Sequence, residues 1–320
     1  MSEAASAPIR IGVSACLLGE KVRFDGGHKR DPYLVETFGR YVECVPVCPE
    51  VEMGLGTPRE TLRLVRISSD IRMIMPKTGA DHTEAMRAYA ARRVLELAKE
   101  NLSGYILKKD SPSCGMERVR VFAAHGVPAK SGRGLFAEAL LQQFPHLPVE
   151  EEGRLSDPRL RENFIERVFV YRWLRTLFAG RWNLGELVAF HTAHKLLLMA
   201  HSPRANTNLG RLVAGGKTVP RAELCSRYEA EFMQALADIA TTRRQTNVLL
   251  HIAGYFRPHL DDASRGELLE LVEDYRRGLI PLVVPLTLIR HYVRRFEIPY
   301  LRGQVYLDPH PKEFMLRNLV

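Results

Sequence analysis

The chain of 320 residues lacks the segments that insert proteins into membranes or export them. No apolar run reaches the length that spans a bilayer, and the polar residues 1–6 have neither the charged region nor the apolar region of a secretory signal. Repeats and low-complexity tracts are also absent. With 46% apolar residues the chain can bury substantial cores, so we expect a folded protein of two ordinary domains without membrane contact.

Cysteine is scarce: the chain has five, and no Cys-x₂-Cys pair occurs. An odd number of cysteines without a secretory signal argues for reduced thiols, and therefore for a cytoplasmic protein rather than a disulfide-stabilised one. We interpret Cys44, inside an apolar strand, and Cys225, on a helix face with aromatic residues, as small apolar core residues.

The other three cysteines, Cys16, Cys48 and Cys114, each lie where a predicted strand passes into a turn. The carboxyl ends of parallel strands meet at one edge of an open sheet, where ligands usually bind. Three converging thiols suit a metal ion or an iron–sulfur cluster with one coordination position left free for chemistry. Their separations match no local zinc motif, so spacing alone leaves buried apolar cysteines as an alternative.

The first half of the chain alternates between strand and helix patterns. An apolar stripe with helical period predicts a helix over 81–100, begun by a capping box of Asp81 and Glu84. Such alternation predicts an α/β fold, with a Rossmann-like open, mostly parallel sheet and helices on its faces. The predicted strands are 9–15, 41–47, 62–67, 71–75 and 104–108, and a second helix is predicted at 134–144.

The strand signal ends after residues 147–153, and helical patterns follow. We therefore expect a boundary near Asp157, with an α/β domain over 1–157 and an all-α domain over 158–320. The predicted helices are 160–178, 184–201, 221–254, 261–277 and 282–296, and the third is long enough that we expect it to bend or break.

Three histidines, His191, His194 and His201, fall on one face of a predicted helix. Three histidines on a face can bind a metal ion, but no carboxylate accompanies them at the usual spacing. We therefore expect them on a polar surface or in hydrogen bonds between the domains.

The net charge is +9, and the positive excess lies mainly in the second half. Residues 1–150 carry 21 Lys and Arg against 18 Asp and Glu, whereas residues 151–320 carry 25 against 19. This excess favours a polyanionic partner such as nucleic acid, although many basic proteins bind none and no known RNA-binding motif occurs.

Three motifs around the turn cysteines resemble those of a known family. The first half is similar to the TudS thiouracil desulfidases, and the second half resembles a helical domain of unknown function often fused to them. The fused arrangement is similar to RudS-like desulfidases, which remove sulfur from 4-thiouridine in transfer RNA. The matching motifs are SACLLG with RFDG at 14–26, PVCPE with GLGTPR at 46–59, LKK with SPSCG at 107–115, FHTAHK at 190–195, TR, NVL and GYF at 242–256, and IPLVVPLTL at 280–288.

This resemblance implies a [4Fe-4S] cluster held by Cys16, Cys48 and Cys114. The fourth iron then has no protein ligand and binds the sulfur of the substrate, which polarises the C=S bond for attack by water. Sulfur leaves as hydrosulfide, and because substrate and product have the same oxidation level, the implied reaction is hydrolytic and redox-neutral.

The resemblance also implies which groups move protons. It places the acid or base at Glu50 and a hydroxyl at Ser111, with Ser113 as the competitor for the hydroxyl role. Without the resemblance, a surface carboxylate at Glu50 and a turn cap at Ser111 are the ordinary interpretations. Candidate substrate contacts in the same motifs are Arg23, Asp25, Arg59, Ser113, Lys108 and Lys109. An equal alternative is that arginine and aspartate pair with each other and only hold their loop in place.

Arginine runs in the second half are candidate contacts to RNA phosphate, which position RNA without reading its sequence. Such runs are usually solvated faces, and a nucleic-acid substrate is what makes them plausible phosphate contacts. The candidates are Arg243, Arg244, Arg257, Arg290, Arg294 and Arg295.

The leading hypothesis is an iron–sulfur enzyme that desulfidates 4-thiouridine in transfer RNA, with a catalytic first domain and an RNA-binding second domain. The alternatives are a desulfidase of free thiouracil or thionucleosides, and a non-catalytic iron–sulfur or zinc protein that binds nucleic acid. The charge of the second half favours the first hypothesis over the second. Glu50 and Ser111 favour an enzyme, because a closed structural site would need a fourth ligand. The thiolated nucleoside and the oligomeric state stay open.

Overall fold

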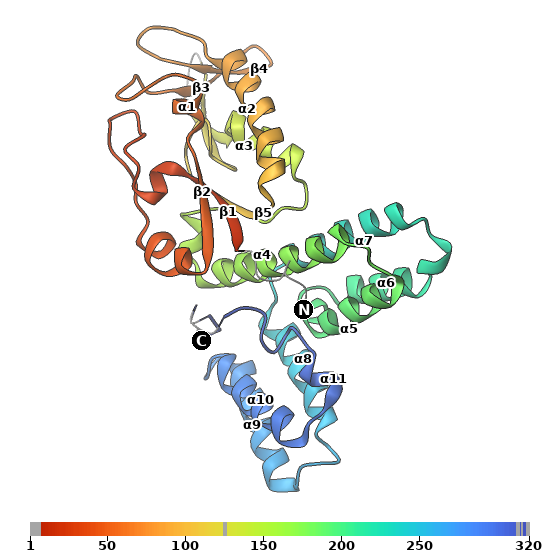
Figure 1. Ribbon diagram of the computed structural model, residues 1–320. Coiled ribbons are helices and arrows are strands. Elements are labelled where there is room, and N and C mark those ends of the chain that lie inside the picture. Colours follow the sequence, from red (N-terminus) through yellow and green to blue (C-terminus); the bar gives the residue numbers. More distant parts are fainter. Residues whose placement is uncertain (1–7, 124–126, 312–313, 315, 318–320) are drawn as a thin grey trace. The chain divides into compact units, whose positions relative to one another are not determined.

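The computed structural model describes residues 8–123, 127–311, 314 and 316–317, so the polar residues 1–6 lie outside the described part. The chain divides into two compact units, residues 1–157 and residues 158–320. The first unit contains strands and helices, and the second is built from helices (Figure 1). The predicted fold class is therefore confirmed.

A four-stranded parallel sheet forms the centre of the α/β unit, with strand order β2-β1-β5-β8 (Figure 1). β1 (Ile9–Ser14) lies between β2 (Val42–Val47) and β5 (Leu102–Leu107), and β8 (Val149–Glu151) pairs with the outer side of β5. Most of β1 and all of β5 are buried, as expected for parallel strands covered on both faces. Because the strands are parallel, their carboxyl ends all meet at the same edge of the sheet.

A second four-stranded sheet, with order β4-β3-β6-β7, is mixed rather than parallel. β3 (Arg63–Ile67) and β4 (Asp70–Ile74) form an antiparallel hairpin, and β6 (Val119–Phe122) runs parallel to β3. β7 (Ala129–Gly132) then pairs antiparallel with β6. The sequence pattern predicts β3 and β4 but not β6 and β7, because four residues are too few to display a period.

One strand and one helix start in this unit were not predicted from the sequence. β8 pairs with β5 inside residues 147–153, the segment after which we expect the strand signal to end. The capping box is also absent from the described contacts, because α2 (Thr83–Leu97) begins two residues later and Asp81 accepts hydrogen bonds from the backbone and hydroxyl of Thr83 instead. The apolar stripe of this helix is buried as predicted, at Met86, Ala90, Val94 and Leu97.

Aromatic rings join the helices of this unit to its parallel sheet. Phe136, on α3 (Leu135–Gln143), contacts Tyr89 of α2 and Tyr105 of β5 with ring centroids 6.3 Å and 6.1 Å away. Gly12 of β1 lies against the same tyrosine, because a Cβ atom there would come within 2.2 Å of the Tyr105 ring. The remaining short elements of this unit are η2 (Ala15–Leu18), η3 (Tyr33–Thr37), η4 (Phe38–Arg40), α1 (Pro49–Glu52), η5 (Ala98–Glu100) and η6 (Arg154–Ser156), and η7 (Gly216–Thr218) belongs to the helical unit.

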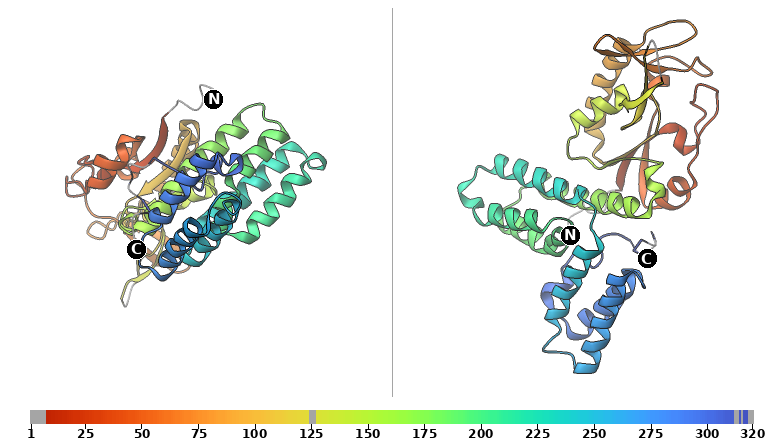
Figure 2. Two further views of the ribbon diagram at one scale, coloured as in Figure 1. Left: turned by 90° about the horizontal axis from the view of Figure 1, so that it is seen from below. Right: turned by 180° about the vertical axis from the view of Figure 1, so that it is seen from behind.

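The helical unit contains the five predicted helical segments, and the long one is broken at 238–241 as expected. The pattern misses α6, a helix that begins with the Ser202 cap and a proline in its first turn. Figure 2 shows α4–α7 packed side by side. Helices α8–α11 come after them along the chain. Within the described ranges, no helix has the length and apolar character needed to cross a membrane. The helices are α4 (Pro158–Ala179), α5 (Leu184–His201), α6 (Pro203–Ala214), α7 (Arg221–Ala237), α8 (Thr242–Tyr255), α9 (Asp262–Arg277), α10 (Val283–Phe296) and α11 (Pro299–Arg302).

The three histidines of α5 are buried inside the helical unit, so the expectation of a polar surface or of bonds between domains is wrong. The Nδ1 atom of His191 lies 3.2 Å from the Tyr228 hydroxyl, and that of His194 lies 2.7 Å from the Phe190 carbonyl oxygen. The rings of His194 and Phe190 stack with centroids 4.0 Å apart. Burial lowers the pKa of both His191 and His194 to about 4.

These lowered pKa values predict that the helical unit loses stability in mild acid. The unfolded chain binds protons at both histidines below about pH 6.5, whereas the folded unit does not until about pH 4. The free energy of unfolding should therefore fall as the pH drops from 6.5 to 4, by about 1.4 kcal/mol per pH unit and histidine. Urea titrations followed by tryptophan fluorescence report on this unit, because both tryptophans, Trp173 and Trp182, belong to it.

His194→Phe is the matched variant, because the Nε2 atom of His194 is buried without a hydrogen-bond partner in the described structure. It should reduce the dependence on pH, while His251→Gln, at an exposed position, should leave it unchanged. Equal pH dependence in wild type and His194→Phe would contradict this account.

Candidate active site in the α/β unit

A cavity of about 360 Å³ lies at the carboxyl ends of β1, β2 and β5. Cys16 belongs to η2, directly after β1, and Cys48 directly follows β2. Cys114 lies in the loop after β5. The cavity brings together most of the predicted site residues, namely Cys16, Cys48, Cys114, Glu50, Ser111, Arg23, Arg59, Lys108 and Lys109.

The three thiols share one environment. Burial raises the pKa of Cys16 to about 11, raises that of Cys48, and raises that of Cys114 well above its ordinary value. The neighbouring thiols contribute to the increases at Cys16 and Cys114, so the three groups are close enough to interact electrostatically. Lys108 and then Arg23 act in the opposite direction on Cys16, because positive charge favours the thiolate.

The spacing of the sulfur atoms disfavours a single metal ion. A tetrahedral zinc ion bound to sulfur at 2.3 Å holds its ligand atoms about 3.8 Å apart. Among the described residues, the group with all its ligand atoms within 4.8 Å of one another is Glu162, Glu166 and His310, and the three thiols do not form such a group. The thiols therefore suit a larger group in which each sulfur binds a different metal atom.

Glu50 is held in the wall of the cavity by two partners. Its Oε2 atom accepts hydrogen bonds from the Nε and Nη2 atoms of Arg59 at 2.9 Å and 2.5 Å. Its Oε1 atom accepts a 2.7 Å hydrogen bond from the Ser113 hydroxyl. The Arg59 side chain also donates to the carbonyl oxygens of Val22 and Gly56 and is only 5% exposed. These contacts fix its position. The carboxylate is thereby oriented before any ligand arrives.

The two candidate serines occupy different places. Ser113 is fully buried, does not line the cavity, and donates its hydroxyl to Glu50. Ser111 lines the cavity, and its Oγ atom accepts hydrogen bonds from the backbone N–H groups of Ser113 and Cys114 at 3.2 Å and 3.1 Å. Ser111 is thus a turn cap, as the ordinary interpretation expects. Both contacts use its oxygen as acceptor, which leaves the hydroxyl proton available to a ligand.

The turn with the serines and Cys114 depends on a close backbone approach at Gly134. A Cβ atom on Gly134 would lie 2.4 Å from the Ser113 carbonyl oxygen, which any larger residue would displace. The Gly134 N–H donates to the Gly115 carbonyl oxygen at 2.8 Å. The start of α3 therefore supports the loop that presents Cys114.

The loop at residues 23–27 brings an aromatic ring to the cavity. Phe24 lines the cavity and remains 37% exposed, with the Arg23 guanidinium 5.2 Å from its ring centroid. Asp25 does not line the cavity; it is half exposed, lies 3.5 Å from Arg23 and accepts a hydrogen bond from the Gly27 backbone. The structure thus gives Asp25 the loop-holding contacts of the alternative interpretation. Sequence reasoning misses Phe24, although it lies between two candidates.

Lys108 and Lys109 line the cavity, and both contact Glu152, the residue after β8. The Lys108 side chain forms an ion pair with Glu152, whose other oxygen accepts the Lys109 backbone N–H at 2.7 Å. The Lys108 backbone N–H donates to the Ser14 hydroxyl at 3.0 Å, and a hydrogen bond from that serine also acts to lower the pKa of Cys114. Sequence reasoning misses Ser14 and Glu152. Glu152 directly follows β8, and recognising that strand would have placed it at the same sheet edge.

The arginines predicted to contact RNA fall into two groups. Arg243, Arg257, Arg294 and Arg295 are exposed. Arg290 donates to the Leu307 carbonyl oxygen, pairs with Asp308 at 3.2 Å and is only 18% exposed, and Arg244 donates to the His201 carbonyl oxygen at 2.6 Å. We therefore assign Arg290 and Arg244 to the internal structure of the helical unit.

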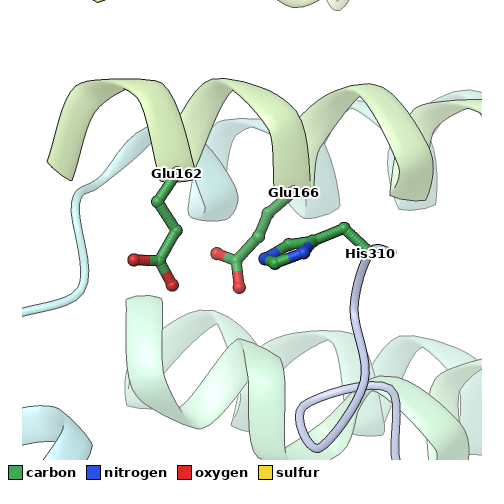
Figure 3. Close-up of side chains that lie close together, drawn as sticks. All are labelled: Glu162, Glu166 and His310. Atoms are coloured by element: carbon green, nitrogen blue, oxygen red, sulfur yellow. The ribbon is translucent and has the colours of Figure 1, made fainter. Parts of the chain in front are cut away.

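A group of charged side chains in the helical unit has the composition of a metal site. Glu162 and Glu166 of α4 lie with His310 so that their ligand atoms are within 4.8 Å of one another (Figure 3). However, Arg317 donates to Glu162 at 2.8 Å and to Glu166 at 2.6 Å, and His201 lies 3.3 Å from the second oxygen of Glu166. Burial acts to raise the pKa of Glu166, but Arg317 and then His201 outweigh it and lower the pKa to about 2. A guanidinium thus already supplies the positive charge that a metal would bring.

Comparison with known proteins finds a matching family for each of the two units. Residues 11–152 match the family of 2-thiouracil desulfurase, and residues 195–311 match DUF1722, a protein of unknown function. The chain is 34% identical over 161 residues to the uncharacterized protein YbgA of Escherichia coli (strain K12), covering 50% of this chain and 95% of that protein. It is 32% identical over 150 residues to the uncharacterized protein YbbK of Bacillus subtilis (strain 168), covering 45% and 97%.

A solved structure of the [4Fe-4S]-dependent thiouracil desulfidase TudS is 32% identical and covers 48% of this chain and 97% of that chain, with a TM-score of 0.40. The fold and the cavity define an α/β protein with a three-cysteine site, joined to a helical domain. The chain belongs to the 2-thiouracil desulfurase family, with a DUF1722 domain in its second half.

The ion pairs of Arg317 predict a large loss of stability when the guanidinium is removed. Arg317→Met leaves two carboxylates without their cation, of which Glu166 is fully enclosed, so the free energy of unfolding should fall by about 3–5 kcal/mol. Urea unfolding followed by tryptophan fluorescence measures this loss. The control is Arg302→Met, whose exposed pair with Glu297 should contribute less than about 1 kcal/mol. Stabilisation of the wild type by zinc, lost in Glu166→Gln, would instead assign this group to a metal.

Proposed function

We propose that this protein is a [4Fe-4S]-dependent desulfidase that removes sulfur from 4-thiouridine in transfer RNA. The reaction converts C=S to C=O by addition of water and releases hydrosulfide, without a change of oxidation level. The observation that carries the proposal is the presence of three thiols, a fixed carboxylate and a hydroxyl in one cavity, namely Cys16, Cys48, Cys114, Glu50 and Ser111.

The cavity fits a cluster with one iron free of protein ligands. Its described lining contains the three cysteines but no fourth cysteine and no histidine, and the three thiols are not among the described groups whose ligand atoms all lie within 4.8 Å of one another. Lys108 and Arg23 favour the thiolate form of Cys16, the form that binds iron. When bound, such a cluster supplies a soft Lewis acid for a thiocarbonyl sulfur.

The chain's own residues then handle water and protons. Glu50 is held as a hydrogen-bond acceptor by Arg59 and Ser113, which suits it to take a proton from the attacking water. The Ser111 hydroxyl is available to donate to the departing sulfur or to the new oxygen. The exposed ring of Phe24 and the Arg23 side chain offer a flat face and a charge for a pyrimidine.

RNA as the substrate is supported by the charge of the helical half and by its exposed arginines. Residues 151–320 carry 25 Lys and Arg against 19 Asp and Glu. Four of the six candidate arginines, Arg243, Arg257, Arg294 and Arg295, remain exposed. A desulfidase of free thiouracil is the second candidate, favoured by the description of the family that residues 11–152 match.

The cysteine assignment predicts a cluster of about four irons and four sulfides per chain after anaerobic reconstitution. Replacing Cys16, Cys48 or Cys114 by Ala should abolish the iron absorbance, because each supplies one of three ligands. Cys44→Ala and Cys225→Ala, outside the cavity, are the matched controls and should keep it. A colourless wild type with stoichiometric zinc would refute the cluster.

The proton-transfer assignments predict inactive variants that keep the cluster. Reconstituted wild type should convert 4-thiouridine to uridine in thiolated transfer RNA, measured by nucleoside analysis after anaerobic incubation. Glu50→Gln and Ser111→Ala should lose about 10²-fold or more in turnover with unchanged iron content. Ser113→Ala should lose less, because this serine orients Glu50 but does not face the cavity.

Each outcome of that experiment has a definite meaning. Full activity in Glu50→Gln would reject the role of Glu50 as a base. A Ser113→Ala variant less active than Ser111→Ala would assign the catalytic hydroxyl to Ser113 instead of Ser111. Turnover of free 4-thiouracil without turnover of transfer RNA would select the free-base desulfidase.

A further inference from the structure

Two sets of aromatic rings lie near the surface of the helical unit, where the end of α8 meets the end of α10 and α11. Tyr255 stacks on Tyr300 with ring centroids 5.2 Å apart and ring planes 19° apart. His259 stacks on Phe296 at 5.1 Å and 18°. His251, one turn before Tyr255, meets that tyrosine edge-on at 5.6 Å. We call these five residues the aromatic ladder.

The aromatic ladder meets the core of its own helices at Phe296, which also stacks on the buried Tyr292 with ring centroids 5.9 Å apart. The core positions of α8 and α10 are other residues, fully or almost fully buried, such as Leu249, Ile252 and Ile289. The ladder histidines are exposed, and its other three rings are half-buried. Stacked rings that stay accessible to solvent present flat faces to a ligand, whereas core packing would enclose them.

Three exposed arginines lie close to the ladder residues in the sequence, and one of them contacts a ladder ring. Arg257, Arg294 and Arg295 are exposed, and the Arg295 guanidinium lies 5.3 Å from the centroid of the Phe296 ring. In the described part of the chain, no ion pair occupies Arg257 or Arg294. The acidic neighbours are Asp261, whose carboxyl pKa is lowered chiefly by the Ser264 backbone and also by Arg295, and Glu297, which pairs with Arg302 at 3.3 Å.

We propose that the aromatic ladder and its arginines form a binding surface for unpaired bases of RNA. Flat rings beside guanidinium groups match the two features of a single strand, the accessible faces of its bases and its phosphates. Bases within an RNA duplex are stacked on one another, so their faces are closed to side chains. An acidic peptide would satisfy the arginines but would leave the rings unused. The surface should therefore prefer single-stranded RNA to duplex RNA.

The test measures binding by the full-length chain and needs no turnover, so its outcome is independent of the proposed desulfidase activity. The probes are a fluorescein-labelled oligouridylate of about twelve nucleotides and a labelled RNA duplex of the same length, each titrated at two salt concentrations. His259→Leu/Tyr300→Leu removes two flat rings but keeps apolar side chains. This variant should bind oligouridylate about 10-fold or more weakly, with an unchanged dependence on salt.

Two matched variants separate the rings from the charges. His259→Phe/Tyr300→Phe keeps the rings and should bind within about threefold of wild type. Arg257→Gln/Arg294→Gln should reduce the slope of log affinity against log salt by about 1.4, since each phosphate contact to a single strand contributes about 0.7. Arg276→Gln/Arg277→Gln, exposed on α9 and paired with Glu273, removes the same charge elsewhere and should leave the slope unchanged.

Three results would overturn the proposal. One is oligouridylate binding by the leucine variant as tight as that of wild type, which would mean that the rings only pack the helix ends. Another is equal binding of duplex and single strand. The third is displacement of RNA by polyglutamate to the same extent from wild type and the leucine variant, which would reveal a purely electrostatic surface. If the leucine variant has a lowered melting temperature, the comparison of single-stranded with duplex RNA on the wild type still tests the proposal, because it needs no variant.

Discussion

The parallel pairing of β1 with β2 and β5 is the constraint on which the cavity depends. Val13 and Ser14 of β1 pair with Pro46 and Val47 of β2, so Cys16 and Cys48 both lie within two residues of the last paired position. A slip of one residue in this register would turn the side chains of one strand to the opposite face. The third cysteine lies farther from its strand, and its loop needs additional attachments. One is the hydrogen bond from the Lys108 backbone to the Ser14 hydroxyl, which joins β5 to the end of β1.

The contacts around Glu50 join the loops of the three cysteine motifs to one another. Arg59 binds the carboxylate and the carbonyl oxygens of Val22 and Gly56, so one guanidinium connects the loops of the first two cysteine motifs. Ser113 connects the same carboxylate to the third. Ser111, in turn, caps the Cys114 turn and still faces the cavity. A turn cap and a catalytic hydroxyl are therefore compatible, because the first role uses the oxygen lone pairs and the second uses the proton.

The sequence predicts the parts of this structure that repeat over several residues. Strands of five or six residues and the buried stripe of α2 show a period, and so the sheet edge with its cysteines is predictable. β8 has three residues and shows none, which hides Glu152 in an apparent linker. The α5 histidines show why a helix face that looks polar in the sequence can still be buried. His191 lies within hydrogen-bond distance of the Tyr228 hydroxyl and His194 of the Phe190 carbonyl oxygen, contacts that the sequence pattern does not contain. Arg317 pairs with Glu162 and Glu166 across more than 150 positions, and no local pattern contains that information.

The arginines of the helical unit illustrate why charge alone is a weak guide to nucleic-acid binding. Arg290 and Arg294 are one turn apart on α10, yet the first is bound to the Leu307 carbonyl oxygen and the second is exposed. Exposed guanidinium groups attract any RNA, folded or not, because they read only phosphate. A 4-thiouridine inside folded RNA is stacked, and it must leave the stack before its sulfur can reach a buried site. A surface that binds unpaired bases has a higher affinity for RNA whose base has left the stack than for RNA whose base is stacked. Binding shifts the equilibrium between these two forms only through such a difference in affinity. The aromatic ladder supplies that difference, which the arginines by themselves do not.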